Sequence, residues 1–354
     1  HPLAKAGTFD VQAKMYAEKT AFNMPNPEIN VESPTGEFYA VGVSQSFEFP
    51  TIYSRQKKVA KATTALAQAG QRVSENDLRF TVRSLYLEAQ LAAYQSRQWA
   101  ERDSLYQAIA AAAARQFNAG EIDFLQKTMT DNEAGNVHQE RLAAEQKSAT
   151  LYQQLATFTG LTNPGTLSPL LADTVGMFLI PDIANNPSVV YEQQVVQLSE
   201  RQISLAKSRA LPNFSLGYLN QGASNTPVEY RFRAGIGIPL WVGQYSAGTK
   251  STKAENQAAA ARAEAQRQAV ALELQRVRTE AVTAFRQVQY SEQEALPRSR
   301  SLIVAALRMR EAGQMDYLAF LRTLDEAYSI QRNYTTQTQA FETARIQMLY
   351  LTGQ

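Results

Sequence analysis

The chain repeats itself at one fixed spacing, and this repeat constrains the fold more than any other feature of the sequence. The segment around Gly120 reads "AGEIDFL", and the segment around Gly313 reads "AGQMDYL". Gly160 closes "LATFTG" and Gly353 closes "LYLTG", and the two glycines of each pair are 193 residues apart. A constant period of this kind indicates that one structural unit occurs twice in the chain.

Each unit contains a stretch that favours an unusually long helix. The stretch between Pro50 and Gly120 holds 69 residues, the stretch between Pro239 and Gly313 holds 73, and both are rich in Ala, Gln, Arg and Glu. At ~1.5 Å per residue, each predicts a helix of roughly 100 Å. Pro297 should kink or break the second helix about four turns before its end, because proline removes a helical hydrogen bond.

A return helix is predicted after each long helix, over residues 123–160 and 316–353. In the second of these, Tyr334, Phe341 and Met348 recur at intervals of seven, which is the spacing of a coiled coil. The tight turns between long and return helices are expected at about 117–123 and 310–316. The sequence therefore predicts pairs of antiparallel helices.

Four strands complete the units, and their side chains alternate between apolar and polar or small residues. They are expected within about 27–49 and 213–238, as two hairpins. The apolar face is predicted to hold Val41, Val43, Phe47, Phe232, Ile236 and Ile238. The charged residues of the opposite face are predicted to be Glu48, Glu229, Arg231 and Arg233.

The expected fold is mainly helical with a small transmembrane β part. Two tandem repeats run in the order helix, strand, strand, helix, helix, with the first over 1–160, a linker or equatorial segment over 161–186, and the second over 187–354. Strands of ~10 residues, tilted by ~40°, match the apolar thickness of a membrane. Closing a barrel takes about eight strands, so several chains would have to contribute. The apolar face is then expected to contact lipid.

Composition excludes several classes of function. The chain has no cysteine and two histidines, so disulfides, thiolate metal sites and histidine-rich metal sites are not expected. His138 lacks the second histidine of a zinc-binding helix motif and is expected to be a surface residue. A net charge of +2 without a basic run predicts no nucleic-acid partner. No nucleophile and base are suitably arranged, so neither an enzyme nor a cofactor is expected.

These features together resemble the TolC family of outer-membrane efflux channels. The likeness covers essentially the whole chain and rests on "ALPNFSLGY" (210–218), "GIGIPLW" (235–241), the two turn segments, "ALP" (295–297) and the terminal "LTG". Within the family, "VSQSFEFP" (43–50) is most similar to the heavy-metal, CzcC/CusC-like subgroup. The resemblance implies a homotrimer with a twelve-stranded barrel, four strands from each chain, continued by a long periplasmic α-helical barrel.

The resemblance also implies a function and partners. The trimer would sit in the lipid of the outer membrane of a Gram-negative bacterium, with a periplasmic extension. It would passively conduct cargo, expected to be heavy-metal cations, from a periplasmic adaptor (a membrane fusion protein) and an inner-membrane RND-type pump. A typical member has a signal peptide, often with a lipidated cysteine, and this sequence shows neither. We therefore expect either a processed channel or the channel part of a polypeptide that includes the pump.

Two alternatives remain open at this point. One is a drug-efflux or type I secretion conduit of the same fold, since a conduit need not recognise its cargo. The other is a soluble coiled-coil rod with a structural or binding role, which explains the helices but gives the amphipathic strands no purpose.

The turns are where adaptor contact and gating are expected. Gly120 and Gly313 would supply a left-handed turn conformation. Two interpretations of Asp123 and Asp316 are open. In the first they are helix caps only. In the second they additionally form, in a trimer, rings of three carboxylates that favour cations. The arginines expected to lock neighbouring helix pairs are Arg115, Arg308 and Arg310.

Overall fold

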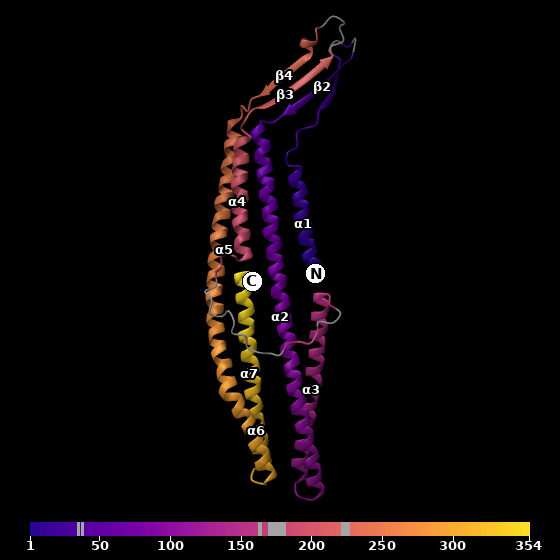
Figure 1. Cartoon of the computed structure of the whole chain (residues 1–354), viewed down its shortest axis with the longest axis vertical. Helices are drawn as coiled ribbons and strands as arrows, with labels where there is room; N and C mark the ends of the chain where they lie inside the picture. Colours follow the sequence, from indigo (N-terminus) through magenta and orange to yellow (C-terminus); the bar gives the residue numbers. More distant parts are fainter. Residues whose placement is uncertain (34–35, 37–38, 162–164, 169–181, 221–226) are drawn as a thin grey trace. The chain divides into compact units, whose positions relative to one another are not determined.

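A computed structural model describes residues 1–33, 36, 39–161, 165–168, 182–220 and 227–354. It is mainly helical, with one four-stranded antiparallel sheet (Figure 1). The chain divides into two compact units that each draw on both halves of the sequence. We call residues 2–75 and 184–270 the strand unit, and His1 with residues 76–183 and 271–354 the turn unit.

The strand unit contains the sheet. Its strands are β1 (Glu28–Glu32), β2 (Ala40–Phe47), β3 (Asn213–Asn220) and β4 (Phe232–Gly237), in the spatial order β1-β2-β3-β4. Val43 pairs with Ile29 and with Tyr218, and Tyr218 pairs with Phe232. This register brings the apolar residues of all four strands to one face, so the predicted hairpins are confirmed, and the alternation is confirmed within these four strands.

The helices of the strand unit are α1 (Pro2–Lys19), α4 (Pro187–Ser208) and the first parts of α2 (Pro50–Asn118) and α5 (Val242–Tyr290). The α4 helix begins where the sequence predicts, because Asn186 accepts hydrogen bonds from the backbone N–H groups of the first turn. Polar contacts join the helices: Arg55 donates to the Ser204 carbonyl at 2.7 Å, and Asn256 donates to the Ser199 hydroxyl at 2.7 Å.

The turn unit contains the two predicted helix pairs. The first pair is the second part of α2 with α3 (Phe124–Thr159), and the second pair is the last part of α5 and α6 (Leu296–Glu311) with α7 (Tyr317–Thr352). The α2 helix has 69 residues, as predicted. The predicted heptad residues of α7, Tyr334, Phe341 and Met348, are all buried.

The expected interruption near Pro297 is confirmed, and its form is a π-helical turn. Residues Ser291–Ala295 lie in this turn between α5 and α6. Proline has no N–H to donate in the helix, and a switch of hydrogen-bonding pattern just before it accommodates that loss. The turn is held by side chains of α7: Ser291 donates to Gln337 at 2.6 Å, and the Tyr334 hydroxyl donates to Glu292 at 2.9 Å.

Among the described residues, no helix is long and apolar enough to cross a membrane. The predicted linker over 161–186 lies mostly outside the described residues. The boundaries of the two sequence repeats stay a prediction, because the compact units divide the chain in a different way.

Candidate functional site: the helix-pair turns and the sheet

The two turns of the turn unit have the same backbone structure. Gly120 has φ of 76° and Gly313 has φ of 67°, which is the left-handed region that favours glycine. The residue after each glycine donates back into the preceding helix, Glu121 to the Gln116 carbonyl at 2.9 Å and Gln314 to the Met309 carbonyl at 2.9 Å. These bonds define a Schellman motif, which ends each helix at its predicted position.

Both predicted aspartates are helix caps. The Asp123 carboxylate accepts a hydrogen bond from the Gln126 N–H at 2.7 Å, and Asp316 accepts from the Ala319 N–H at 2.9 Å. Both side chains are also exposed. Capping is therefore confirmed as one role, while the carboxylate-ring role stays a prediction because it depends on further subunits.

The three arginines of the turns occupy different environments. Arg115 and Arg308 are exposed, whereas Arg310 is half-buried. The Arg310 guanidinium lies 5.8 Å from the ring centre of buried Tyr317, which places it against the start of α7. Such a cation–π contact can hold the two helices of one pair together. Locking of neighbouring helix pairs by these arginines stays a prediction.

A buried charged cluster lies deeper in the turn unit, and the sequence interpretation missed it. Asp103 is buried on α2, where its Oδ2 lies 2.9 Å from Arg141 Nε and 3.1 Å from His138 Nδ1. His138 is thus only partly a surface residue, because its ring reaches a buried carboxylate. The signal that could have revealed the cluster is an Arg-Asp pair on the helix face that also carries Trp99 and Tyr106.

The surroundings of Asp103 stabilise its charged form. Burial acts to raise the pKa of this carboxyl, but hydrogen bonds with His138 and Gln107, together with the charges of His138 and Arg141, hold the pKa below its usual value. The neighbouring Arg102 is also buried. Burial raises the pKa of the Tyr328 hydroxyl to about 12, although the positive charge of Arg102 acts to lower it. Among the described residues, no group of three or more His, Asp or Glu side chains could hold a metal ion.

The sheet presents its predicted apolar face to the outside of the strand unit. Five of the six predicted residues are between 46% and 66% exposed, and Phe47 is half-buried. Ile238 lies one residue beyond the end of β4. By contrast Ala40, Gly42 and Leu219, on the opposite face, are buried. An ordinary soluble sheet buries its apolar face, whereas the described residues leave this one exposed.

The prediction that Glu229 and Arg231 lie on a strand is wrong. Residues Val228–Arg231 form a 3₁₀ turn, in which the Tyr230 N–H donates to the Pro227 carbonyl at 3.2 Å. Strand alternation ends where the backbone is no longer extended. The Arg231 side chain donates instead to Asn220 Oδ1 at 2.7 Å.

The other two charged residues flank or line the polar face. Arg233 lies on β4, and its guanidinium reaches Glu32 of β1 at 3.8 Å, across the two central strands. Glu48 lies after the end of β2, where its N–H donates to the Tyr53 hydroxyl at 2.9 Å. Glu48 therefore belongs to the junction between β2 and α2, and Arg233 to the sheet itself.

Comparison with known proteins identifies the fold. No family model and no curated protein matches the chain. The outer-membrane channel OprN is 14% identical with a TM-score of 0.81, and the match covers 99% of this chain and 86% of that one. The CmeC outer membrane channel of Campylobacter jejuni is 11% identical with a TM-score of 0.80, covering 100% and 83%. CusC, whose structures concern transmembrane channel formation, is 16% identical with a TM-score of 0.79, covering 99% and 88%.

The chain therefore has the fold of outer-membrane channels, as the resemblance to the TolC family implied.

Proposed function

We propose that this chain is one of three identical subunits of an exit duct in the outer membrane of a Gram-negative bacterium. The observation that carries the proposal is the exposed apolar face of a four-stranded sheet, in a chain with the fold of outer-membrane channels. Lipid is the partner that satisfies such a face without any further protein.

Three copies solve the problem of the sheet edges. Within the described residues, β1 and β4 are the two outer strands of the sheet. Open edges expose unpaired backbone groups, which is unfavourable in water and more so in lipid. Joining β1 of one subunit to β4 of the next yields a closed twelve-stranded barrel. Its lumen would carry the polar face, with Arg233, Glu32, Asn30 and Ser44.

The helices would continue this barrel into the periplasm, and the turns would meet the partners. The exposed Asp123, Asp316, Arg115 and Arg308 offer charged groups for contact with a periplasmic adaptor. An inner-membrane RND-type pump supplies the energy in this proposal, so the duct itself needs no catalysis. A pump fused in the same polypeptide is a second form of the proposal.

Heavy-metal cations are the proposed cargo, and this choice rests only on the resemblance of "VSQSFEFP" (43–50) to the heavy-metal subgroup. CusC shares the fold, but OprN and CmeC match with TM-scores at least as high, so the fold supports all cargo classes alike. A drug-efflux or type I secretion conduit is accordingly the second candidate. The soluble rod is disfavoured, because it would leave the apolar sheet face in water.

Membrane reconstitution tests the proposal. The purified chain should require detergent to stay monodisperse, should elute as a trimer, and should form ion-conducting pores in planar bilayers. A chain that stays a monodisperse monomer without detergent, and adds no conductance, would support the rod instead. Resistance of an efflux-deficient host to metal ions, drugs and exported peptides would then separate the cargo classes.

A further inference from the structure

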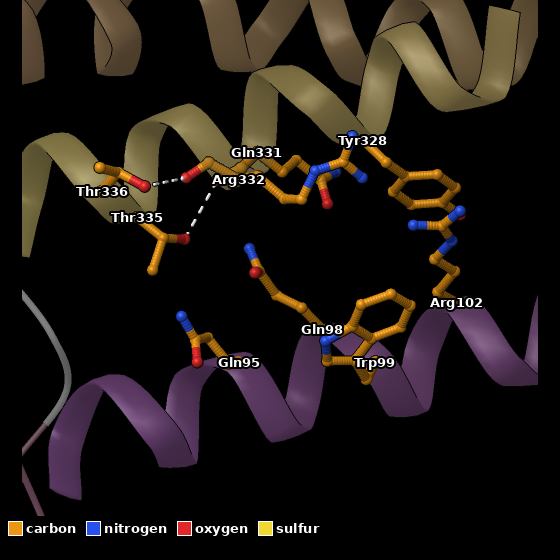
Figure 2. Close-up of a pocket in the computed structure, with 9 residues that line it drawn as sticks. All are labelled: Gln95, Gln98, Trp99, Arg102, Tyr328, Gln331, Arg332, Thr335 and Thr336. Carbon is orange, nitrogen blue, oxygen red and sulfur yellow. Dashed lines mark hydrogen bonds between the residues drawn. The ribbon is translucent and has the colours of Figure 1, made fainter. Parts of the chain in front are cut away.

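A small polar pocket lies between α2 and α7 in the turn unit, apart from the turns and the sheet. It has a volume of 260 Å³ (Figure 2). Gln95 and Gln98 extend into it from α2, and Thr335 extends from α7. The volume lies just below the usual range for drug-sized ligands, about 300–1,000 Å³, so the pocket would fit a molecule with one or two rings.

One end of the pocket is formed by Arg102 and aromatic rings. The Arg102 guanidinium carbon lies 4.5 Å from the ring centre of Tyr328 and 5.0 Å from that of Trp99. Arg102 is 9% exposed, so its position is set by packing rather than by solvent. Rings on two sides orient the planar guanidinium, as cation–π contacts do.

The charge of Arg102 is incompletely compensated by the protein. Its nearest ion-pair partner is Glu133, with an N–O distance of 3.8 Å. Charge-assisted hydrogen bonds are about 2.7–2.9 Å long, so this pair is too distant to make one. No described residue accepts a hydrogen bond from Arg102 Nε. Buried charges are normally paired closely, so this arginine retains capacity for an anion.

The rest of the lining also favours an anion. A second arginine, Arg332, lines the pocket together with the amides of Gln95, Gln98 and Gln331, and the lining contains no carboxylate. The hydroxyls of Thr335 and Thr336 donate to backbone carbonyls of their own helix, to those of Gln331 and Arg332. The Arg332 guanidinium also donates to Asp325 Oδ1, at the long distance of 3.4 Å. The donors left for a ligand are its other N–H groups, the Arg102 guanidinium and the amide groups, which suit a carboxylate.

We propose that this pocket binds a small aromatic carboxylate, whose ring contacts Trp99 and Tyr328 and whose carboxylate is held by Arg102 and Arg332. The inference does not depend on the proposed duct, because both sides of the pocket belong to one subunit. It assigns the chain a site for an organic anion in addition to any conducted cargo.

Tryptophan fluorescence tests the proposal directly. The chain has two tryptophans, Trp99 in the pocket and Trp241, which is 76% exposed. In the full chain carrying Trp241→Phe, Trp99 alone reports on binding. We expect saturable quenching by 4-nitrobenzoate. We expect 4-nitrobenzamide, which has the same ring without the charge, to bind about tenfold more weakly. Both probes carry the same nitro group, so non-specific quenching is the same for both and does not affect their comparison.

A variant that removes one positive charge from the pocket gives a second test. Arg332→Gln should weaken 4-nitrobenzoate binding by about three- to tenfold, the smaller effect being typical of a half-exposed arginine, and leave 4-nitrobenzamide unchanged. Arg332 is exposed, so the variant should fold. Arg322→Gln removes an exposed arginine of the same helix outside the pocket and should change neither probe. Equal, non-saturable quenching by both probes, or unchanged binding in Arg332→Gln, would overturn the proposal.

Discussion

At the scale of single residues, a substitution can separate the two roles of Asp123 and Asp316, which are helix capping and attraction of cations to the pore. Asparagine caps a helix about as well as aspartate, whereas alanine costs about 1 kcal/mol per cap. The double variant Asp123→Asn with Asp316→Asn should therefore keep its thermal stability and lower the preference of the pore for cations in planar bilayers. The alanine pair should lose stability as well.

The reversal potential in a salt gradient measures this preference. An unchanged reversal potential in the asparagine pair, with the expected loss of stability in the alanine pair, would leave capping as the only role of the two aspartates.

Asp103 is a buried charge of the turn unit that contacts Arg141 and His138. Asp103→Asn should lower the free energy of unfolding by about 2–4 kcal/mol at neutral pH, because Arg141 then lacks its buried ion-pair partner. Asp131→Asn is the matched control. It breaks an exposed pair with Lys127 on α3 and should cost less than about 1 kcal/mol.

The pH dependence of the same variant has a definite sign. The folded state holds the pKa of Asp103 below its ordinary value of 3.8, so the folded state favours the ionised form. The stability from this group is present above that value and is lost as pH falls through the lower, folded pKa. The difference in thermal unfolding between wild type and Asp103→Asn should therefore shrink on acidification. A difference that stays constant down to about pH 2 would contradict this account.

At the scale of elements, the sheet separates lipid contact from lumen contact within one strand. Val43 and Ser46 are both on β2, but they point to opposite faces. Val43→Lys should impair membrane insertion by about 2–4 kcal/mol if it lies near the membrane centre, because a charge would face hydrocarbon. Ser46→Lys should insert normally, since its face would be solvated.

The measurement is the fraction of each variant that folds into lipid vesicles. Electrophoresis of unheated samples reports this fraction, because the folded protein migrates as a separate band. Equal insertion of the two lysine variants would mean that the apolar face does not contact lipid.

At the scale of the whole molecule, the trimer can be tested through the absence of cysteine, since any disulfide must come from introduced residues. Ile29 on β1 shares the apolar face with Phe232, Ala234 and Ile236 on β4. Ile29→Cys combined with cysteine at one of these three positions should give covalent dimers and trimers, because neighbouring strands bring Cα atoms within about 4.4–6.8 Å.

Ile29→Cys with Leu216→Cys is the control for this experiment, because β3 is an inner strand of the sheet. It should remain monomeric on a denaturing gel without reductant. The absence of cross-links in all three β1–β4 pairs would argue against edge-to-edge joining of the subunits.

Local signals made much of the fold predictable from the sequence. Pro50 and Gly120 bound a 69-residue helix, because proline is tolerated at a helix start and glycine adopts the left-handed conformation at its end. The caps and the strand alternation likewise depend on residues close together in the chain. Glu229 and Arg231 are predicted on a strand but lie before β4, because a 3₁₀ turn after Pro227 also satisfies backbone hydrogen bonds locally.

The remaining features arise from contacts between distant segments. Arg102 meets Tyr328 across two helices from opposite halves of the chain, and Asp103 meets Arg141 and His138 across a helix pair. Hydrophobic periodicity does not predict these contacts, because they depend on which faces of the long helices pack together and on the register between the helices. Periodicity and capping therefore specified the elements and the amphipathic faces, whereas the buried charges and the pocket between α2 and α7 followed from packing, which desolvates groups that the sequence shows only as polar.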